Sequence, residues 1–164
     1  MAWAFMADQI GSRPKAGIQP SLRARAMRFL ARREHSRAEL RRKLAPKVAE
    51  GEDLDAVLDD LAQRGWLSDA RFVEHTARAK ARRFGPIKLD HYLRSRGVDD
   101  DAIAAGLRAA GEQGAAQLEA VWKSRFKAPP ADERGNARQV RFLQGRGFAL
   151  EDIFRFLRSL GASR

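Results

Sequence analysis

The chain has 164 residues, which allows one compact domain or a few small modules in line. Its hydrophobic content of 44% is typical of a folded protein, and the absence of cysteine excludes a disulfide framework, a thiol nucleophile and a cysteine-ligated zinc site. The formal net charge of +11 is high for this length and favours an anionic partner such as a nucleic acid.

The first 20 residues predict a flexible leader, because glycine and proline recur there and no apolar period is sustained. The short apolar run "AWAFM" follows no basic region and ends before Asp8, so it is a poor signal peptide. No apolar run in the chain approaches the roughly 18 residues of a membrane span. These features predict a soluble, cytoplasmic protein that does not associate with membranes.

Residues 21–66 predict a first unit of three helices. An apolar stripe at helical spacing runs from Leu22 to Leu30 and indicates the first helix. A third helix, with inward-facing leucines, is expected between Gly51 and Gly65.

The middle helix of this unit begins with the stretch "SRAEL". Ser36 and Glu39 have the spacing of a capping box, in which each side chain accepts a hydrogen bond from the backbone N–H of the other residue. Leu40 and Leu44 form the inward face of the helix. Because Pro46 has no backbone donor, the helix is expected to stop or kink near it.

The later part of the chain repeats itself. The stretch "YLRSRGVDDDAIAAGL" (92–107) aligns without gaps on "FLQGRGFALEDIFRFL" (142–157), and a helix-ending glycine, Gly97 or Gly147, holds the same position in both. A looser first copy surrounds Leu44. Repeated helical units bury their faces against one another. The prediction is an all-α fold: an elongated tandem array of three three-helix repeats with about nine helices, over residues 21–66, 67–111 and 112–164.

Charge is unevenly distributed along the chain. Residues 21–50 hold ten basic and three acidic side chains, a net of +7, whereas residues 51–70 hold one basic and six acidic, a net of −5. Arginines at helical spacing form rows that suit a nucleic-acid backbone or an acidic protein groove, although a solvated face partly neutralised by the aspartates of 53–60 would look the same. Exposed aromatics do not alternate with these arginines, so base stacking is not predicted. The candidate contact residues are Arg25, Arg28, Arg32, Arg33, Arg37, Arg41, Arg42, Lys43, Arg71, Arg78, Arg82 and Arg83.

No catalytic or metal site is predicted. His35, His75 and His91 are separate and none has another histidine one helical turn away, which favours structural or surface roles. The sequence contains no Walker loop, no H-E-x-x-H and no G-x-S-x-G. We therefore expect no enzymatic activity and no cofactor.

Three blocks in succession resemble a known family. They are "FLARREHSRAELRRKL" (29–44), "LDDLAQRGWLSDARFVEH" (58–75) and "FGPIKLDHYLRSRGV" (84–98), and in this order they are similar to the motifs of RecX-type regulators of the RecA recombinase. The resemblance covers residues 22–107 well and the third unit more weakly. Two departures are Ser68, where many relatives carry an acidic residue, and the unusual connection over 127–138.

The resemblance implies a non-enzymatic regulator in DNA repair, recombination and the SOS response. Such a protein would bind the RecA–DNA filament along its groove and lower the ATPase and strand exchange of RecA; binding to DNA alone is also associated with the family. Its partners would be the RecA filament and the single-stranded DNA within it, with free DNA as a further candidate, and we expect a monomer. The basic residues of 32–43 would contact phosphates or an acidic filament surface.

Other functions fit the same residues. A helical-repeat protein that binds duplex DNA directly, as a transcription regulator, could use its three-helix units to present recognition helices. A scaffold that contacts only proteins is a third possibility, and it predicts negligible affinity for DNA at low salt.

Overall fold

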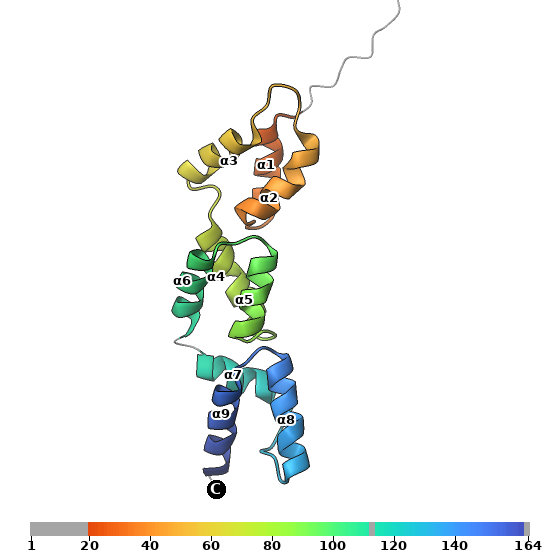
Figure 1. Ribbon diagram of the computed structural model, residues 1–164, viewed down its shortest axis with the longest axis vertical. Helices are drawn as coiled ribbons and strands as arrows, with labels where there is room; N and C mark the ends of the chain where they lie inside the picture. The colour runs from red at the N-terminus through yellow and green to blue at the C-terminus, as the bar shows by residue number, and fades with distance from the viewer. Residues whose placement is uncertain (1–19, 112–113, 163–164) are drawn as a thin grey trace, which may run out of the picture.

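The computed structural model describes residues 20–111 and 114–162. Within them it contains nine α-helices, one short 3-10 helix and no strand. Figure 1 shows an elongated molecule in which three groups of three helices follow one another along the long axis. The predicted all-α tandem array is therefore confirmed, whereas the predicted leader lies, apart from Pro20, outside the described residues. The elements are α1 (Leu22–Leu30), α2 (Arg37–Leu44), η1 (Ala45–Lys47), α3 (Leu54–Gln63), α4 (Asp69–Lys80), α5 (Pro86–Ser95), α6 (Asp100–Gly111), α7 (Gly114–Lys123), α8 (Glu133–Gly145) and α9 (Leu150–Ala162).

We call α1–α3 the first repeat, α4–α6 the second and α7–α9 the third. Each repeat has a hydrophobic core of its own. Leu44, Leu93 and Leu143 stand at matching positions of the three repeats, and all three are fully buried. Since each core of the described residues lies within one repeat, the shape of the molecule depends on the contacts that join one repeat to the next.

Six of the described helices begin with a side-chain cap. The capping residues are Ser21, Ser36, Asp53, Ser68, Asp99 and Asp132, whose oxygens accept hydrogen bonds from backbone N–H groups of the first helical turn. Ser68 therefore caps α4, so the departure from the acidic residue of many relatives leaves this helix with a cap. The caps explain why each apolar stripe begins where it does.

The predicted capping box of α2 is only half formed. The Ser36 hydroxyl accepts a hydrogen bond from the Glu39 backbone N–H at 3.1 Å, as expected. The Glu39 carboxylate, however, does not return to the Ser36 backbone; it binds the Arg33 guanidinium at 2.5 and 3.1 Å. An arginine in the turn before the helix competes better for a buried carboxylate than a neutral N–H does.

The middle helices α2, α5 and α8 lie end to end and join the repeats (Figure 1). At the first joint, the Ser36 hydroxyl donates a hydrogen bond to the Arg96 carbonyl at 2.7 Å. At the second, the Gly85 backbone N–H donates to the Arg146 carbonyl, also at 2.7 Å, and Ile87 N–H donates to Gly147. Each joint thus uses the start of one middle helix to satisfy carbonyls at the end of the next.

The two matched glycines make these joints possible. Gly97 and Gly147 have φ angles of 73° and 90°, which side chains rarely adopt, and they end α5 and α8 at equivalent places. A Cβ at Gly97 would stand 2.5 Å from the Ala38 Cβ in the neighbouring repeat. The gapless alignment of the sequence therefore marks an inter-repeat contact as well as a helix end.

Candidate nucleic-acid and protein interface

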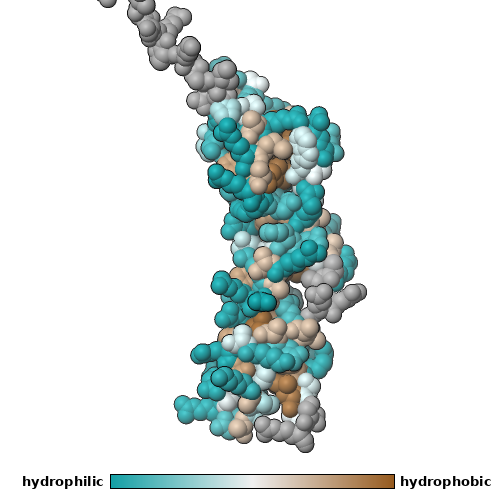
Figure 2. Space-filling model, turned by 180° about the vertical axis from the view of Figure 1, so that it is seen from behind, coloured by the Kyte–Doolittle hydropathy of each residue, from teal (hydrophilic) through white to brown (hydrophobic). Residues whose placement is uncertain are grey.

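Figure 2 shows hydrophilic residues along the whole length of one face with smaller hydrophobic areas between them. The predicted contact residues do not behave as one set. They divide into those held in buried or inter-repeat contacts, those paired with exposed carboxylates, and those that make no ion pair within the described residues.

Arg33 and Lys43 belong to a polar cluster at the first joint. The Glu39 residue is only 3% exposed, yet it contacts Arg33, Lys43 at 3.6 Å and Arg96 at 3.4 Å. Burial would raise the pKa of the Glu39 carboxyl, but the hydrogen bond and the charge of Arg33, with help from Lys43, lower that pKa to about 2. The carboxylate is therefore ionised and holds three cations in place.

His35 completes this cluster in its neutral form. It is 2% exposed, with Nδ1 3.0 Å from the Arg33 carbonyl and Nε2 3.0 Å from Lys43 Nζ. Because an ammonium can only donate, Nε2 is the acceptor and Nδ1–H donates to the carbonyl. Burial and the nearby cations lower the pKa of His35, which favours this neutral tautomer. The expected structural or surface role of His35 is thus a structural one.

Arg37 and Arg41 of α2 pair with carboxylates of α3. The Arg37 guanidinium lies 2.7 Å from Asp59, and that of Arg41 lies 3.1 Å from Asp55. These side chains are exposed, so each pair adds little to stability, on the order of 0–1 kcal/mol. The acidic run of the sequence thus neutralises part of the basic face, which was the alternative to a free contact surface.

Three further predicted residues also have partners. Arg25 donates from Nε to the Pro20 carbonyl at 2.7 Å. Arg71 of α4 reaches back to Glu34 at 2.9 Å, across the first joint. Arg78 pairs with Glu74, one helical turn away, at 2.6 Å. Arg71 is therefore part of the connection between repeats, and Arg78 is a locally paired surface residue.

The remaining five predicted residues are exposed and make no ion pair with any described residue. Two of them belong to the second repeat and follow α4 directly, and three belong to the first. They are the strongest contact candidates of the predicted set, because no protein carboxylate has to be displaced before an anion binds. These residues are Arg28, Arg32, Arg42, Arg82 and Arg83.

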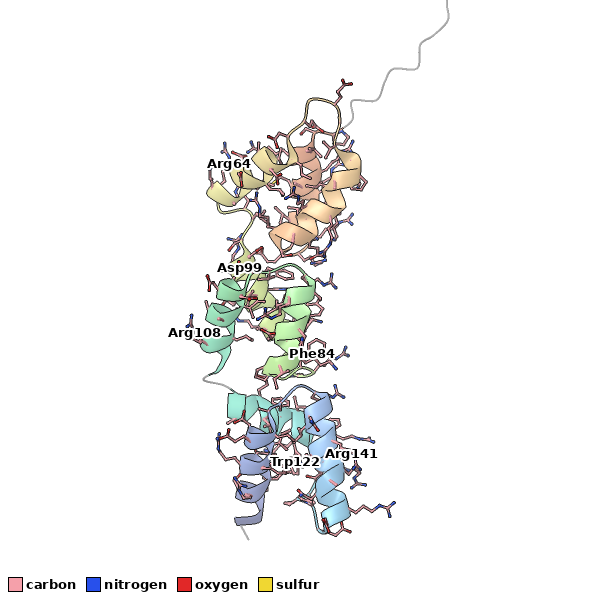
Figure 3. All side chains as sticks on the ribbon, viewed as in Figure 1. Arg64, Phe84, Asp99, Arg108, Trp122 and Arg141 are labelled. Carbon is pink, nitrogen blue, oxygen red and sulfur yellow. The ribbon has the colours of Figure 1, made fainter. Side chains whose placement is uncertain are left out.

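A basic row in the third repeat was not among the predicted contact residues. Arg134, Arg138 and Arg141 follow one another along α8 at helical spacing, all exposed and without an ion pair to any described residue. Figure 3 shows Arg141 on this helix. Arg125 and Lys127, in the connection from α7, have the same properties. The α8 arginines recur at helical spacing, as those of α4 do, so the criterion that selected the α4 residues would also have selected this row.

Other kinds of site receive no support from the described residues. They contain no group of three or more histidine, cysteine, aspartate or glutamate side chains that could hold a metal ion. None of the described helices is long and apolar enough to cross a membrane. His75 and His91 are exposed, and neither makes a contact that would indicate acid–base chemistry.

Comparisons with known proteins point to one family. Models of the first, second and third three-helix domains of RecX match residues 23–61, 68–107 and 112–157 in that order. The regulatory protein RecX of Leptothrix cholodnii is 44% identical over 140 residues, covering 85% of this chain and 89% of that protein. The regulatory protein RecX of Ralstonia nicotianae is 42% identical over 142 residues, covering 87% and 89%.

A solved structure has the same fold. The crystal structure of RecX from Lactobacillus salivarius superposes with a TM-score of 0.74 and covers 86% of this chain and 95% of that one. Its sequence identity is 15%, so this likeness concerns the architecture.

Proposed function

The chain belongs to the RecX family of regulatory proteins, and on that premise we propose that it binds the RecA–DNA filament and lowers the ATPase and strand exchange of RecA. It acts in the cytoplasm and without chemistry of its own. The observation that carries this proposal is the match to all three RecX domains in order, over an elongated array rather than a compact body with one pocket. An elongated body suits a partner that is itself a filament, because it can follow several protomers.

The distribution of charge supports a contact with the filament. The exposed arginines without ion pairs meet DNA phosphates or acidic groups of RecA first. Arg37 and Arg41 can follow by exchanging their aspartates for phosphate, at low cost because the present pairs are exposed. Arg33 and Lys43 remain paired with Glu39 and support the contact surface without binding the filament themselves.

The test is the ATPase rate of RecA on single-stranded DNA, titrated with the protein well below one copy per RecA protomer. A steep fall at these low ratios is expected, because one bound copy blocks growth or loosens contacts for many protomers. A DNA-independent ATPase serves as the control and should not respond. No fall at saturating protein would remove the proposal for the RecA tested.

Two other outcomes would assign different functions. Tight binding to a selected duplex sequence without RecA would favour a transcription regulator, since base readout requires a preferred sequence. Binding to RecA with no affinity for DNA at low salt would leave a scaffold that contacts proteins only.

A further inference from the structure

Two half-buried aromatic rings frame a pocket on the third repeat. Phe126, after α7, packs edge to face against Phe142 of α8, with ring centroids 5.3 Å apart. Arg125, Phe126, Arg138 and Phe142 line a pocket of about 300 Å³, which we call the α8 pocket. The guanidinium of Arg138 lies 5.9 Å from the Phe126 centroid, and that of Arg146 lies 5.0 Å from the Phe142 centroid. The pocket therefore offers ring faces and positive charge together.

The second repeat carries a related aromatic pair, with Lys80 as a further cation 4.3 Å from the Tyr92 centroid. Phe84, after α4, packs edge to face against Tyr92 of α5 at 6.1 Å. Lys88 lies 5.2 Å from the Phe84 centroid, and Arg96 lies 5.0 Å from the Tyr92 centroid. Lys88 and Tyr92 on α5, and Arg96 directly after it, stand fifty positions before Arg138, Phe142 and Arg146, although Arg96 also pairs with Glu39 at 3.4 Å. Figure 3 places Phe84 at the end of the second repeat that faces the third, so the arrangement recurs along the array.

The surroundings of the α8 pocket are strongly basic. Residues 123–146 hold seven basic side chains against two acidic ones, a net of +5. Of the two acids, Asp132 caps α8 by accepting the Gly135 N–H. Glu133 makes no ion pair with any described residue. Lys123 pairs with Glu119 of α7 at 2.6 Å, whereas Arg125, Lys127 and Arg138 make no ion pair with a described residue.

A ligand for this pocket must combine a flat π surface with regularly spaced negative charge. A nucleobase stacked on Phe126 or Phe142 supplies the first, and the phosphates on either side of it supply the second to the α8 arginines. Duplex DNA keeps its base faces within the stack, and an acidic peptide lacks bases. Moving an exposed guanidinium from a ring to a phosphate loses less than a stacked base gains.

We propose that the α8 pocket binds a base of single-stranded nucleic acid, with Arg125 and Arg138 on the flanking phosphates, and that the Phe84–Tyr92 pair extends this contact into the second repeat. This proposal rests on the proposed function, because the single-stranded DNA that the pocket would meet is the DNA within the RecA filament. The stacking itself needs no RecA, so it is tested with this protein alone.

The experiment is fluorescence anisotropy of the full chain with labelled oligo(dT) of about 20 nucleotides. An abasic strand of the same length serves as the second probe. The wild-type protein should bind oligo(dT) about tenfold more tightly than the abasic strand, because only the former can stack. The double variant Phe126→Leu/Phe142→Leu should lose about tenfold affinity for oligo(dT), lose little for the abasic strand, and keep the salt dependence of the wild type.

Charge variants separate stacking from simple attraction. Arg138→Gln should lower the slope of log affinity against log salt by about 0.7, as the loss of one phosphate contact predicts. Arg158→Gln is the matched control, since it removes the same charge from an exposed position on α9 with no ion pair to a described residue. It should bind within about twofold of the wild type.

Equal affinity of the wild type for oligo(dT) and the abasic strand would overturn the proposal without any variant, even if the leucine substitutions impair folding. Leucine variants that keep the wild-type circular dichroism melt and the wild-type affinity for oligo(dT) would overturn it as well. If such variants nevertheless fail to inhibit the ATPase of RecA, the pocket contacts protein and not a base. A protein that prefers oligo(dT) but leaves that ATPase unchanged would contradict the proposed function alone.

Discussion

Glu39→Gln tests whether one buried carboxylate organises the first joint. The substitution keeps the size of the side chain and removes the charge that holds Arg33, Lys43 and Arg96. A pKa near 2, against an ordinary value of 4.5, corresponds to about 3 kcal/mol of stabilisation at most. Because the Arg33 side chain is 43% exposed, solvent screens part of this, and we expect a loss of about 2 kcal/mol.

The loss can be measured as a shift of the thermal midpoint by circular dichroism at pH 7. For a chain of this size about 2 kcal/mol corresponds to a decrease of about 4–8 °C. Glu50→Gln is the control, because Glu50 is exposed and makes no contact with a described residue that the change would remove. It should change the free energy of unfolding by no more than about 0.5 kcal/mol.

The pH dependence gives the same prediction a second readout. A carboxyl whose pKa is lowered in the folded state contributes its full stabilisation above its unfolded pKa and loses it as the pH falls through the folded one. The gap between wild type and Glu39→Gln should therefore be constant above about pH 4.5 and shrink from there towards pH 2. A variant that melts within about 1 °C of the wild type at pH 7 would refute this account of the joint.

Three further predictions concern the basic face, the glycine joint and the buried histidine. Replacing Arg37, Arg41 and Arg42 together by alanine should weaken filament binding and lower its salt slope by about 2, with helical circular dichroism unchanged; binding at the wild-type slope would contradict their assignment. Gly97→Ala should cost about 2–4 kcal/mol in urea unfolding, from a left-handed backbone and a clash across the joint. Because burial lowers the pKa of His35, neutral His35 stabilises the fold fully above about pH 6.5, and this stabilisation is lost as the pH falls below that value. His35→Gln should lower the free energy of unfolding by about 1–2 kcal/mol at pH 7 and make it depend less on pH in this range.

The glycine prediction has an internal control. Gly65 also has a left-handed φ, of 71°, but a Cβ there would meet no atom within 4 Å. Gly65→Ala should therefore cost only the backbone strain, about 1 kcal/mol. Equal losses for the two substitutions would show that the contact between Gly97 and the neighbouring repeat contributes nothing.

The fold could be predicted from the sequence because its signals are local. Apolar spacing located the helices, and the match of Gly97 to Gly147 located the repeat, since both are properties of neighbouring residues. The pairing of Arg37 with Asp59 was foreseen only as an alternative, because it depends on how α2 packs against α3. Nothing in the local pattern showed that Glu39 would be turned towards Arg33 and away from the Ser36 backbone.

The aromatic pairs could not be predicted from the sequence, for a different reason. Base stacking was not predicted because aromatics do not alternate with arginines along the chain. Phe126 and Phe142 are sixteen positions apart, and only the packing of the α7–α8 connection on α8 brings their rings together. A search for rings at equivalent places in two repeats, such as Tyr92 and Phe142, would have given a hint of it.

The end-to-end packing of the middle helices also distinguishes the two joints from one another. At one joint the Ser36 hydroxyl donates to the neighbouring repeat, and at the other the Gly85 backbone N–H donates. If two repeats were exchanged, these donors would no longer face the carbonyls that accept from them. At the outer ends of this line, Asp132 caps the start of α8, and the 3-10 turn that contains Pro46 follows the end of α2. A repeat that recombination inserted into the array or duplicated would therefore have to carry the groups that fit the joint it enters.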